Sequence, residues 1–254
     1  MGTQLIVGNW KMNTTVSEAE TLVKTFMSLV SNLSDTEVAF APPFQALPIV
    51  GSLISQSPFH LAAQNMYWEE DGAYTGEVSG RMLQDLGCRY VILGHSERRQ
   101  LLGETNEMVN RKVHTALKYQ LQPILCLGET LEDREHHRTQ SVVEDQVREG
   151  LKDITAKDVE SVTLAYEPIW AIGTGRAATL EQIEDVHRFL RTTVEKQFGQ
   201  SSVPLRILYG GSVTPTNAPE LFQSPQINGG LVGKACLNPE SFATLVQLAS
   251  TKIS

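Results

Sequence analysis

A carboxylate stands at the end of an apolar run, in the segment Leu164-Ala-Tyr-Glu-Pro-Ile-Trp-Ala-Ile-Gly-Thr-Gly-Arg176. The residues after Glu167 stay apolar until Gly173, which is unusual for an ordinary loop. Such a segment is typical of a lid with glycine hinges, which closes over a carboxylate, excludes water and makes the carboxylate a stronger base. We therefore predict that Glu167 is a general base. The alternative is a strand end on the surface with a packing tryptophan.

A histidine follows a second apolar run, in the segment Tyr90-Val-Ile-Leu-Gly-His-Ser-Glu-Arg-Arg99. The pattern after the run indicates that a helix starts near Ser96. A helix N-terminus disfavours the charged imidazolium, so a neutral His95 could donate a hydrogen bond to a carbonyl while Glu167 takes a carbon-bound proton. The alternative is that His95 has a purely structural role. Only the other motifs in the chain favour a catalytic role for it.

A lysine and an asparagine follow a third apolar run, in Val7-Gly-Asn-Trp-Lys-Met-Asn13. Asn9 and Lys11 come just after the run, so they should lie at the carboxyl end of a strand, on the same side of the sheet as the other two sites. A lysine at this place can hold an anion or an oxygen that becomes negative. A solvated charge at a strand end is the alternative.

Two glycine-rich segments complete the set, Ile207-Leu-Tyr-Gly-Gly-Ser-Val213 and Ile227-Asn-Gly-Gly-Leu-Val-Gly-Lys-Ala235. Both run from apolar residues into glycines, which let backbone amides approach a phosphate. In an eight-stranded parallel barrel, the loops after strands seven and eight commonly form such a phosphate site. Either segment alone is a weak signal, because glycine is also an ordinary turn residue.

These residues need a scaffold, and short apolar segments alternate along the chain with amphipathic stretches. The segments lie near residues 5–8, 37–41, 59–63, 90–93, 123–127, 162–166, 205–209 and 229–232. Eight such alternations predict an α/β fold, a (β/α)8 TIM barrel. The helical pattern is clearest over residues 16–30, 107–119 and 180–198. No linker divides the chain, so we expect one domain over residues 1–254.

Taken together, the segments closely resemble the triosephosphate isomerase family, whose motifs match residues 9–13, 94–99, 166–175 and 209–213 in order and spacing. The resemblance runs from about residue 5 to residue 250. It implies interconversion of dihydroxyacetone phosphate and D-glyceraldehyde 3-phosphate through an enediolate, without cofactor or metal. The family is a standard example of a glutamate base beside a neutral histidine, so that pairing is not an independent finding.

The resemblance also implies a role for each residue. Glu167 would shuttle the proton between adjacent carbons, and His95 would polarise the carbonyl and move protons between oxygens. Lys11 would stabilise the enediolate, and Asn9 would orient the substrate and the lysine. The phosphate would be bound at Gly173, Ser212, Gly233 and Lys234. The residues expected to support the site are Ser96, Glu97, Ile172, Tyr209 and Leu231, with Glu97 as the partner of Lys11.

The segment 64–79 resembles the family's projecting interface loop. By this resemblance Thr75 should reach toward the partner's Asn9 and the partner's His95, and the protein should be a homodimer. Periodicity alone would indicate only a long surface loop.

Lys234 is the clearest departure from the family pattern, because many members have a second glycine at this place. Lysine removes some backbone freedom. If the backbone keeps an ordinary conformation, the amide can still face the phosphate, and the ammonium either points to solvent or adds a salt-sensitive attraction. We favour solvent, because exposed lysine head groups are strongly hydrated.

Composition excludes several other classes of protein. A net charge of −8 argues against nucleic-acid binding, and the chain has no apolar run long enough to span a membrane and no signal segment. Three widely spaced cysteines, Cys88, Cys126 and Cys236, indicate a reduced cytoplasmic protein without a zinc site. A phosphorylated substrate must then be attracted locally, by Lys11, Lys234 and backbone amides.

Two other functions stay open. A Schiff-base aldolase on the same barrel would use Lys11 as its nucleophile. A binding protein without activity is the second, although all four residues expected to do chemistry are present. The segment 173–178 also fits the pattern of a dinucleotide-binding loop, but it lacks the tight strand-to-helix turn that such a loop requires.

Overall fold

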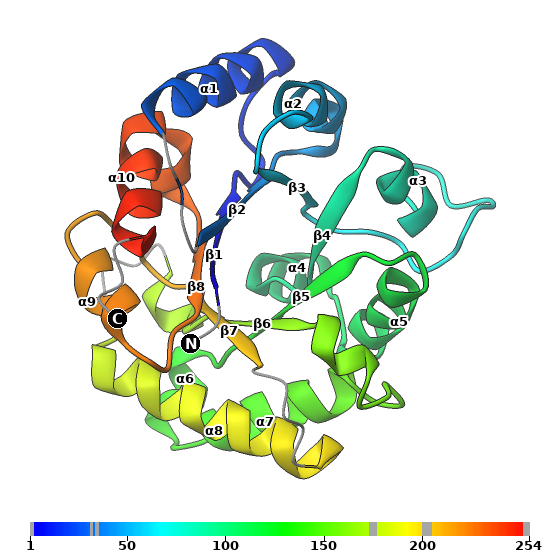
Figure 1. The fold of residues 1–254 in the computed structure, drawn as a ribbon. Helices are drawn as coiled ribbons and strands as arrows, with labels where there is room; N and C mark the ends of the chain where they lie inside the picture. Colours follow the sequence, from blue (N-terminus) through cyan, green and yellow to red (C-terminus); the bar gives the residue numbers. More distant parts are fainter. Residues whose placement is uncertain (1–2, 31–32, 34–35, 173–176, 200–204, 251–254) are drawn as a thin grey trace.

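Eight parallel strands close into a barrel in sequence order, as predicted (Figure 1). The computed structural model describes residues 3–30, 33, 36–172, 177–199 and 205–250. The strands are β1 (Gln4–Asn9), β2 (Thr36–Ala41), β3 (His60–Ala63), β4 (Cys88–Leu93), β5 (Gln122–Leu127), β6 (Thr163–Tyr166), β7 (Arg206–Tyr209) and β8 (Gly229–Val232). Strand β1 pairs with both β2 and β8, which closes the barrel.

Helices surround the barrel and connect the strands (Figure 1). The α-helices are α1 (Val16–Leu29), α2 (Leu47–Ile54), α3 (Gly80–Asp85), α4 (Ser96–Leu102), α5 (Asn106–Lys118), α6 (Leu131–Glu135), α7 (Thr139–Gly150), α8 (Leu180–Phe198), α9 (Ala218–Gln223) and α10 (Pro239–Ser250). Short 3₁₀ helices are η1 (Phe44–Ala46), η2 (Asp158–Ser161), η3 (Ile169–Ala171) and η4 (Lys234–Leu237). The three helices predicted most clearly begin and end within one residue of the predicted bounds.

Local sequence fixes where the longer helices begin. The side chain of Thr15 accepts a hydrogen bond from the Glu18 backbone, and the Glu18 carboxylate accepts one in return from the Thr15 backbone, a capping box at the start of α1. Thr179 and Gln182 form the same arrangement at α8. These caps satisfy backbone N–H groups that the first turn of a helix leaves without partners.

Side chains that alternate along each strand form two separate cores. The barrel interior is filled by Leu5, Val7, Ala39, Ala41, Ala62, Tyr90, Ile92, Ile124, Cys126, Ala165, Leu208 and Leu231. The residues between them on the strands, such as Ile6 and Phe40, pack outward against the helices. The filled interior leaves functional side chains only at the ends of the strands.

His187 is a buried histidine on α8 that is not among the residues predicted to do chemistry. The Nδ1–H of His187 donates to the carbonyl of Gln226 at 3.0 Å, and its ring meets the Tyr166 ring edge-on. Its Nε2 is buried and has no hydrogen-bond partner among the described residues. Burial lowers the pKa of His187 from 6.5 to about 4, because protonation would place a charge in this apolar site.

This shift predicts a loss of stability in acid. The unfolded chain binds a proton at His187 near pH 6.5, whereas the folded chain does so only near pH 4, so stability falls as the pH drops between these values. The loss should be on the order of 3 kcal/mol. His187→Gln should remove this part of the pH dependence, while His60 continues to titrate in both proteins. Urea unfolding across this range tests it, and parallel pH profiles for the two proteins would refute it.

Candidate active site

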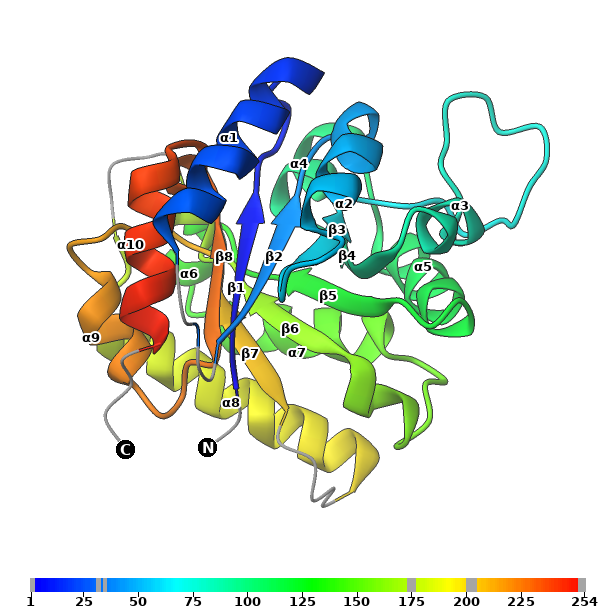
Figure 2. The ribbon, with the colours of Figure 1, turned by 45° about the horizontal axis from the view of Figure 1, so that its top comes forward.

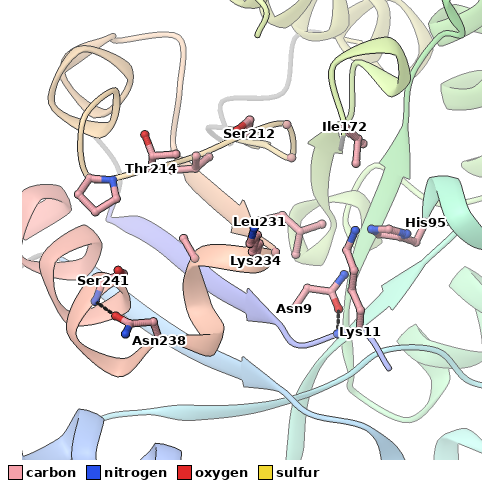
Figure 3. A pocket seen from close by; sticks show the side chains of 16 residues that line it. Asn9, Lys11, His95, Ile172, Ser212, Thr214, Leu231, Lys234, Asn238 and Ser241 are labelled. Carbon is pink, nitrogen blue, oxygen red and sulfur yellow. Dashed lines mark hydrogen bonds between the residues drawn. The ribbon is translucent and has the colours of Figure 1, made fainter. Parts of the chain in front are cut away.

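The four residues predicted to do chemistry lie at the carboxyl ends of their strands. Asn9 ends β1 and Lys11 follows it, His95 comes two residues after β4, and Glu167 comes directly after β6. Asn9, Lys11 and His95 point into one cavity of about 520 Å³ (Figure 3). The other predicted residues that line this cavity are Ile172, Ser212, Leu231, Gly233 and Lys234. Residues from β1, β4, β7, β8 and the segment after β6 thus meet as expected.

Glu167 is 1% exposed and is held by three contacts. The Ser96 backbone N–H donates to its Oε2 at 3.0 Å, the Ser96 hydroxyl to its Oε1 at 3.4 Å, and His95 Nε2 lies 2.9 Å from Oε1. Burial alone would raise the pKa of Glu167, but His95, the Ser96 amide and Lys11 outweigh it and lower the pKa. The base is therefore ionised and buried at once.

Two glycines make room for this carboxylate. A Cβ atom at Gly210 would lie 2.8 Å from the Glu167 Cγ, and one at Gly128 would lie 1.7 Å from the Glu167 backbone oxygen. Any side chain at either place would displace the base. The glycine after β7, predicted as part of a phosphate loop, is therefore also required by the position of Glu167.

His95 is the N-cap residue of α4, where the structure agrees with the predicted helix start. Its Nδ1 accepts a hydrogen bond from the Glu97 backbone at 3.3 Å, so in the neutral ring Nε2 carries the proton and faces Glu167. Burial alone would lower the pKa of His95, but Glu167 and Glu97 raise it. The helix N-terminus therefore does not by itself set the pKa of His95. If the Glu167 carboxylate moves away, the larger of the two raising effects is lost.

Lys11 adopts a left-handed backbone conformation, with φ of 53°, and the Asn9 side chain accepts from its backbone N–H at 3.1 Å. Its ammonium forms an ion pair with Glu97 at 2.5 Å, the partner expected from the resemblance. A Cβ atom at Gly233 would lie 3.4 Å from the Lys11 Cε. The glycine turn after β8 therefore lies directly beside the lysine.

The structure describes three of the four residues predicted to bind the phosphate. Ser212, Gly233 and Lys234 line the cavity, whereas Gly173 lies outside the described residues. Tyr209 is buried beneath the turn after β7, and a Cβ atom at Gly211 would lie 2.2 Å from its hydroxyl oxygen. Burial raises the pKa of Tyr209 to about 12, so this hydroxyl is neutral.

Comparison with known proteins identifies the family of this chain. A family model described as triosephosphate isomerase matches residues 4–249. The chain belongs to the triosephosphate isomerase family. It is 52% identical to the triosephosphate isomerase of Chloroherpeton thalassium over 251 residues, which cover 98% of this chain and 100% of the relative. It is 49% identical to that of Endomicrobium trichonymphae, over 96% of this chain and 97% of the relative.

The sequence analysis missed a second buried glutamate in this member of the triosephosphate isomerase family. Glu129 accepts hydrogen bonds from the Tyr166 hydroxyl at 3.1 Å, from the Trp170 indole at 2.8 Å and from Arg134 at 3.1 Å. The Arg134 guanidinium also lies over the Trp170 ring. Glu129 thereby holds the apolar segment that follows Glu167. Its sequence signal was available, because Glu129 follows β5 much as Glu167 follows β6.

The connection between β3 and α3 projects from the barrel (Figure 2), and Thr75 within it is exposed. Within the described ranges, neither a metal site nor a membrane-spanning helix is found. No group of three or more histidine, cysteine or acidic side chains there is arranged to hold a metal ion. In the same described ranges, no helix is both long and apolar enough to cross a membrane.

Proposed function

We propose that this chain interconverts dihydroxyacetone phosphate and D-glyceraldehyde 3-phosphate by proton transfer through an enediolate, within one barrel domain spanning residues 1–254. One observation carries the proposal. The buried, ionised carboxylate of Glu167 lies 2.9 Å from His95 Nε2, beside a cavity that Lys11 also lines. A base, a hydrogen-bond donor and a cation in this arrangement suit abstraction of a proton next to a carbonyl.

The proposed steps require no atoms beyond substrate and protein. Glu167 leaves its contacts with Ser96 and His95, takes the proton from one carbon and returns it to the adjacent carbon. The Nε2–H of His95 polarises the carbonyl oxygen and then passes protons between the two oxygens. Lys11, oriented through Asn9 and Glu97, stabilises the negative oxygen of the enediolate.

The remaining predicted residues would hold the phosphate and exclude water. Backbone amides near Ser212, Gly233 and Lys234 face the phosphate in this proposal, together with Gly173. Ile172 and Leu231 provide apolar cover over the base, which strengthens its interactions by removing water.

A coupled isomerisation assay on the purified protein tests the function directly. We expect efficient conversion in both directions without an added metal or cofactor. Borohydride treatment in the presence of substrate separates the alternative, because a Schiff-base aldolase would be trapped covalently at Lys11. Trapping at Lys11, or a lack of isomerisation by folded protein, would reject the proposal.

We further propose that the protein is a homodimer in which the loop 64–79 of each subunit covers a cavity of the other. A cavity of about 660 Å³ beside the active site is lined by polar residues, among them Lys11, His95 and Glu97, and by apolar residues. The apolar residues are Met12, Pro43, Phe44, Leu101 and Leu102. Three of these apolar side chains are strongly exposed: Met12 (96%), Leu101 (78%) and Leu102 (64%). Such a concentration of exposed apolar surface fits a protein interface.

Thr75→Arg tests the dimer. A bulky cation in this loop should not fit beside Lys11 and Arg98 of the facing cavity, so both association and activity should fall. Thr192→Arg, an equal change at an exposed position on α8, is the control. Sedimentation at low protein concentration gives the readout. Equal sedimentation of the two variants would argue against a role for this loop.

We also propose a cytoplasmic location and no nucleic-acid partner. All three cysteines are free and buried, which suits a reducing compartment, and the net charge of −8 disfavours binding to phosphodiester backbones.

A further inference from the structure

The active-site cavity carries lysines but no carboxylate among its described lining residues. The cations are Lys11 and Lys234, and the remaining lining is apolar, amide, hydroxyl, imidazole and glycine. Glu167 lies buried beside His95 and does not line the cavity. In a protein with a net charge of −8, this cavity is therefore a local exception to the acidic surface.

The two lysines differ in their partners. Lys11 is paired with Glu97 at 2.5 Å, so that carboxylate offsets its charge. Lys234 is exposed, and within the described ranges it forms no ion pair. In Figure 3 it lies between Asn238 and Lys11 among the cavity-lining side chains. The unbalanced positive charge of the cavity therefore comes from Lys234.

The backbone tolerates lysine at this place. Lys234 begins η4, directly after Gly233, and is not among the non-glycine residues with positive φ. The Cys236 N–H donates to the Gly233 carbonyl at 2.9 Å, which fixes the turn independently of the lysine side chain. An exposed ammonium keeps its hydration, so its charge acts without a desolvation cost.

We propose that the Lys234 ammonium attracts the phosphate dianion of the substrate into the cavity before backbone amides bind it. The inference rests on the proposed function, since the triose substrate supplies the dianion. Salt screens charges over about 8 Å at physiological ionic strength and over longer distances in dilute buffer. The charge therefore acts within the cavity at low salt and is screened at high salt. From the sequence we expected a solvent-facing Lys234 without a salt-sensitive attraction. The structure changes that expectation, because Lys234 is exposed and also lines the cavity.

The test compares Lys234→Gln with Lys157→Gln over a range of ionic strength. Lys157 is exposed at the opposite, amino end of β6, so its loss changes the net charge equally. We expect Lys234→Gln to lower kcat/KM about three- to tenfold at low salt and less than about twofold at high salt, with a smaller effect on kcat. Lys234→Arg should restore the wild-type salt dependence, and Lys157→Gln should not alter it.

A second readout does not depend on catalysis. Inorganic phosphate, titrated by NMR, should bind Lys234→Gln more weakly than Lys157→Gln at low salt, and the difference should vanish as salt rises. The inference is wrong if the two variants behave alike in both measurements. It is also wrong if Lys234→Gln loses the same factor in kcat/KM and in phosphate affinity at every salt concentration. A wild-type protein that lacks isomerase activity but keeps the phosphate difference would overturn the proposed function and leave the inference standing.

Discussion

Replacing Glu167 by glutamine should lower turnover by about 10² to 10⁴ while the protein still binds a phosphorylated inhibitor. The amide keeps the size of the side chain and its contacts with Ser96, but it cannot accept a carbon-bound proton. The loss should therefore fall on kcat, as expected for an interaction made in the transition state. Steady-state kinetics with purified variant provides the measurement.

Glu160→Gln is the matched control for this variant. Glu160 is exposed in η2 at the amino end of the same strand, so the chemical change is identical and lies away from the cavity. Its activity should equal that of the wild type. Turnover by Glu167→Gln within a few-fold of the control would reject Glu167 as the base.

Replacing Lys112 by methionine should cost roughly 3 to 5 kcal/mol of folding stability. Lys112 and Glu104 form a buried ion pair, and the lysine also donates to the Asn65 side chain at 2.8 Å. Glu104 in turn accepts from the Gly94 backbone at 3.1 Å and from Arg98 at 3.3 Å. Loss of the lysine leaves a carboxylate buried with less compensation, which is more costly than loss of an exposed pair.

The same helix offers a matched control. Lys118 on α5 pairs with Glu70 at 3.3 Å, but both side chains are exposed, so Lys118→Met should cost far less stability than Lys112→Met. The double change Lys112→Met with Glu104→Gln should recover part of the loss, because it removes the uncompensated charge. Urea unfolding of these three variants and of the single variant Glu104→Gln gives the four values needed. Equal losses at Lys112 and Lys118, or a double variant that loses the sum of its parts, would contradict this account.

Sequence patterns predicted the elements and most of the site for identifiable reasons. Buried strands and amphipathic helices leave different periodicities, which is why eight strands and the longer helices were located within one or two residues. In a parallel barrel, every strand presents its carboxyl end on one face. That rule, applied to Asn9, Lys11, His95 and Glu167, placed residues far apart in the chain around one cavity.

Contacts between elements could not be predicted in this way. The pairing of Lys112 with Glu104 joins α5 to the connection before it. The helical period places Lys112 on the buried face of α5 with Val109 and Val113, but it does not identify the acid that lies opposite. The position of Glu129 after β5 is visible in the sequence, but its contacts with Tyr166, Trp170 and Arg134 join separate elements and are not. The pKa of His95 depends on the position of the Glu167 side chain, a three-dimensional fact absent from local sequence.

The central claim is that the Glu167 carboxylate moves a proton between adjacent carbons of a triose phosphate. NMR of dihydroxyacetone phosphate in deuterated water, with wild-type protein and Glu167→Gln, tests it most directly, because it follows isomerisation and carbon-bound deuterium together. We predict that the wild type isomerises the substrate and labels it, and that the variant loses both by the same factor, about 10² or more. A folded variant that retains either isomerisation or labelling at the wild-type rate would contradict the claim.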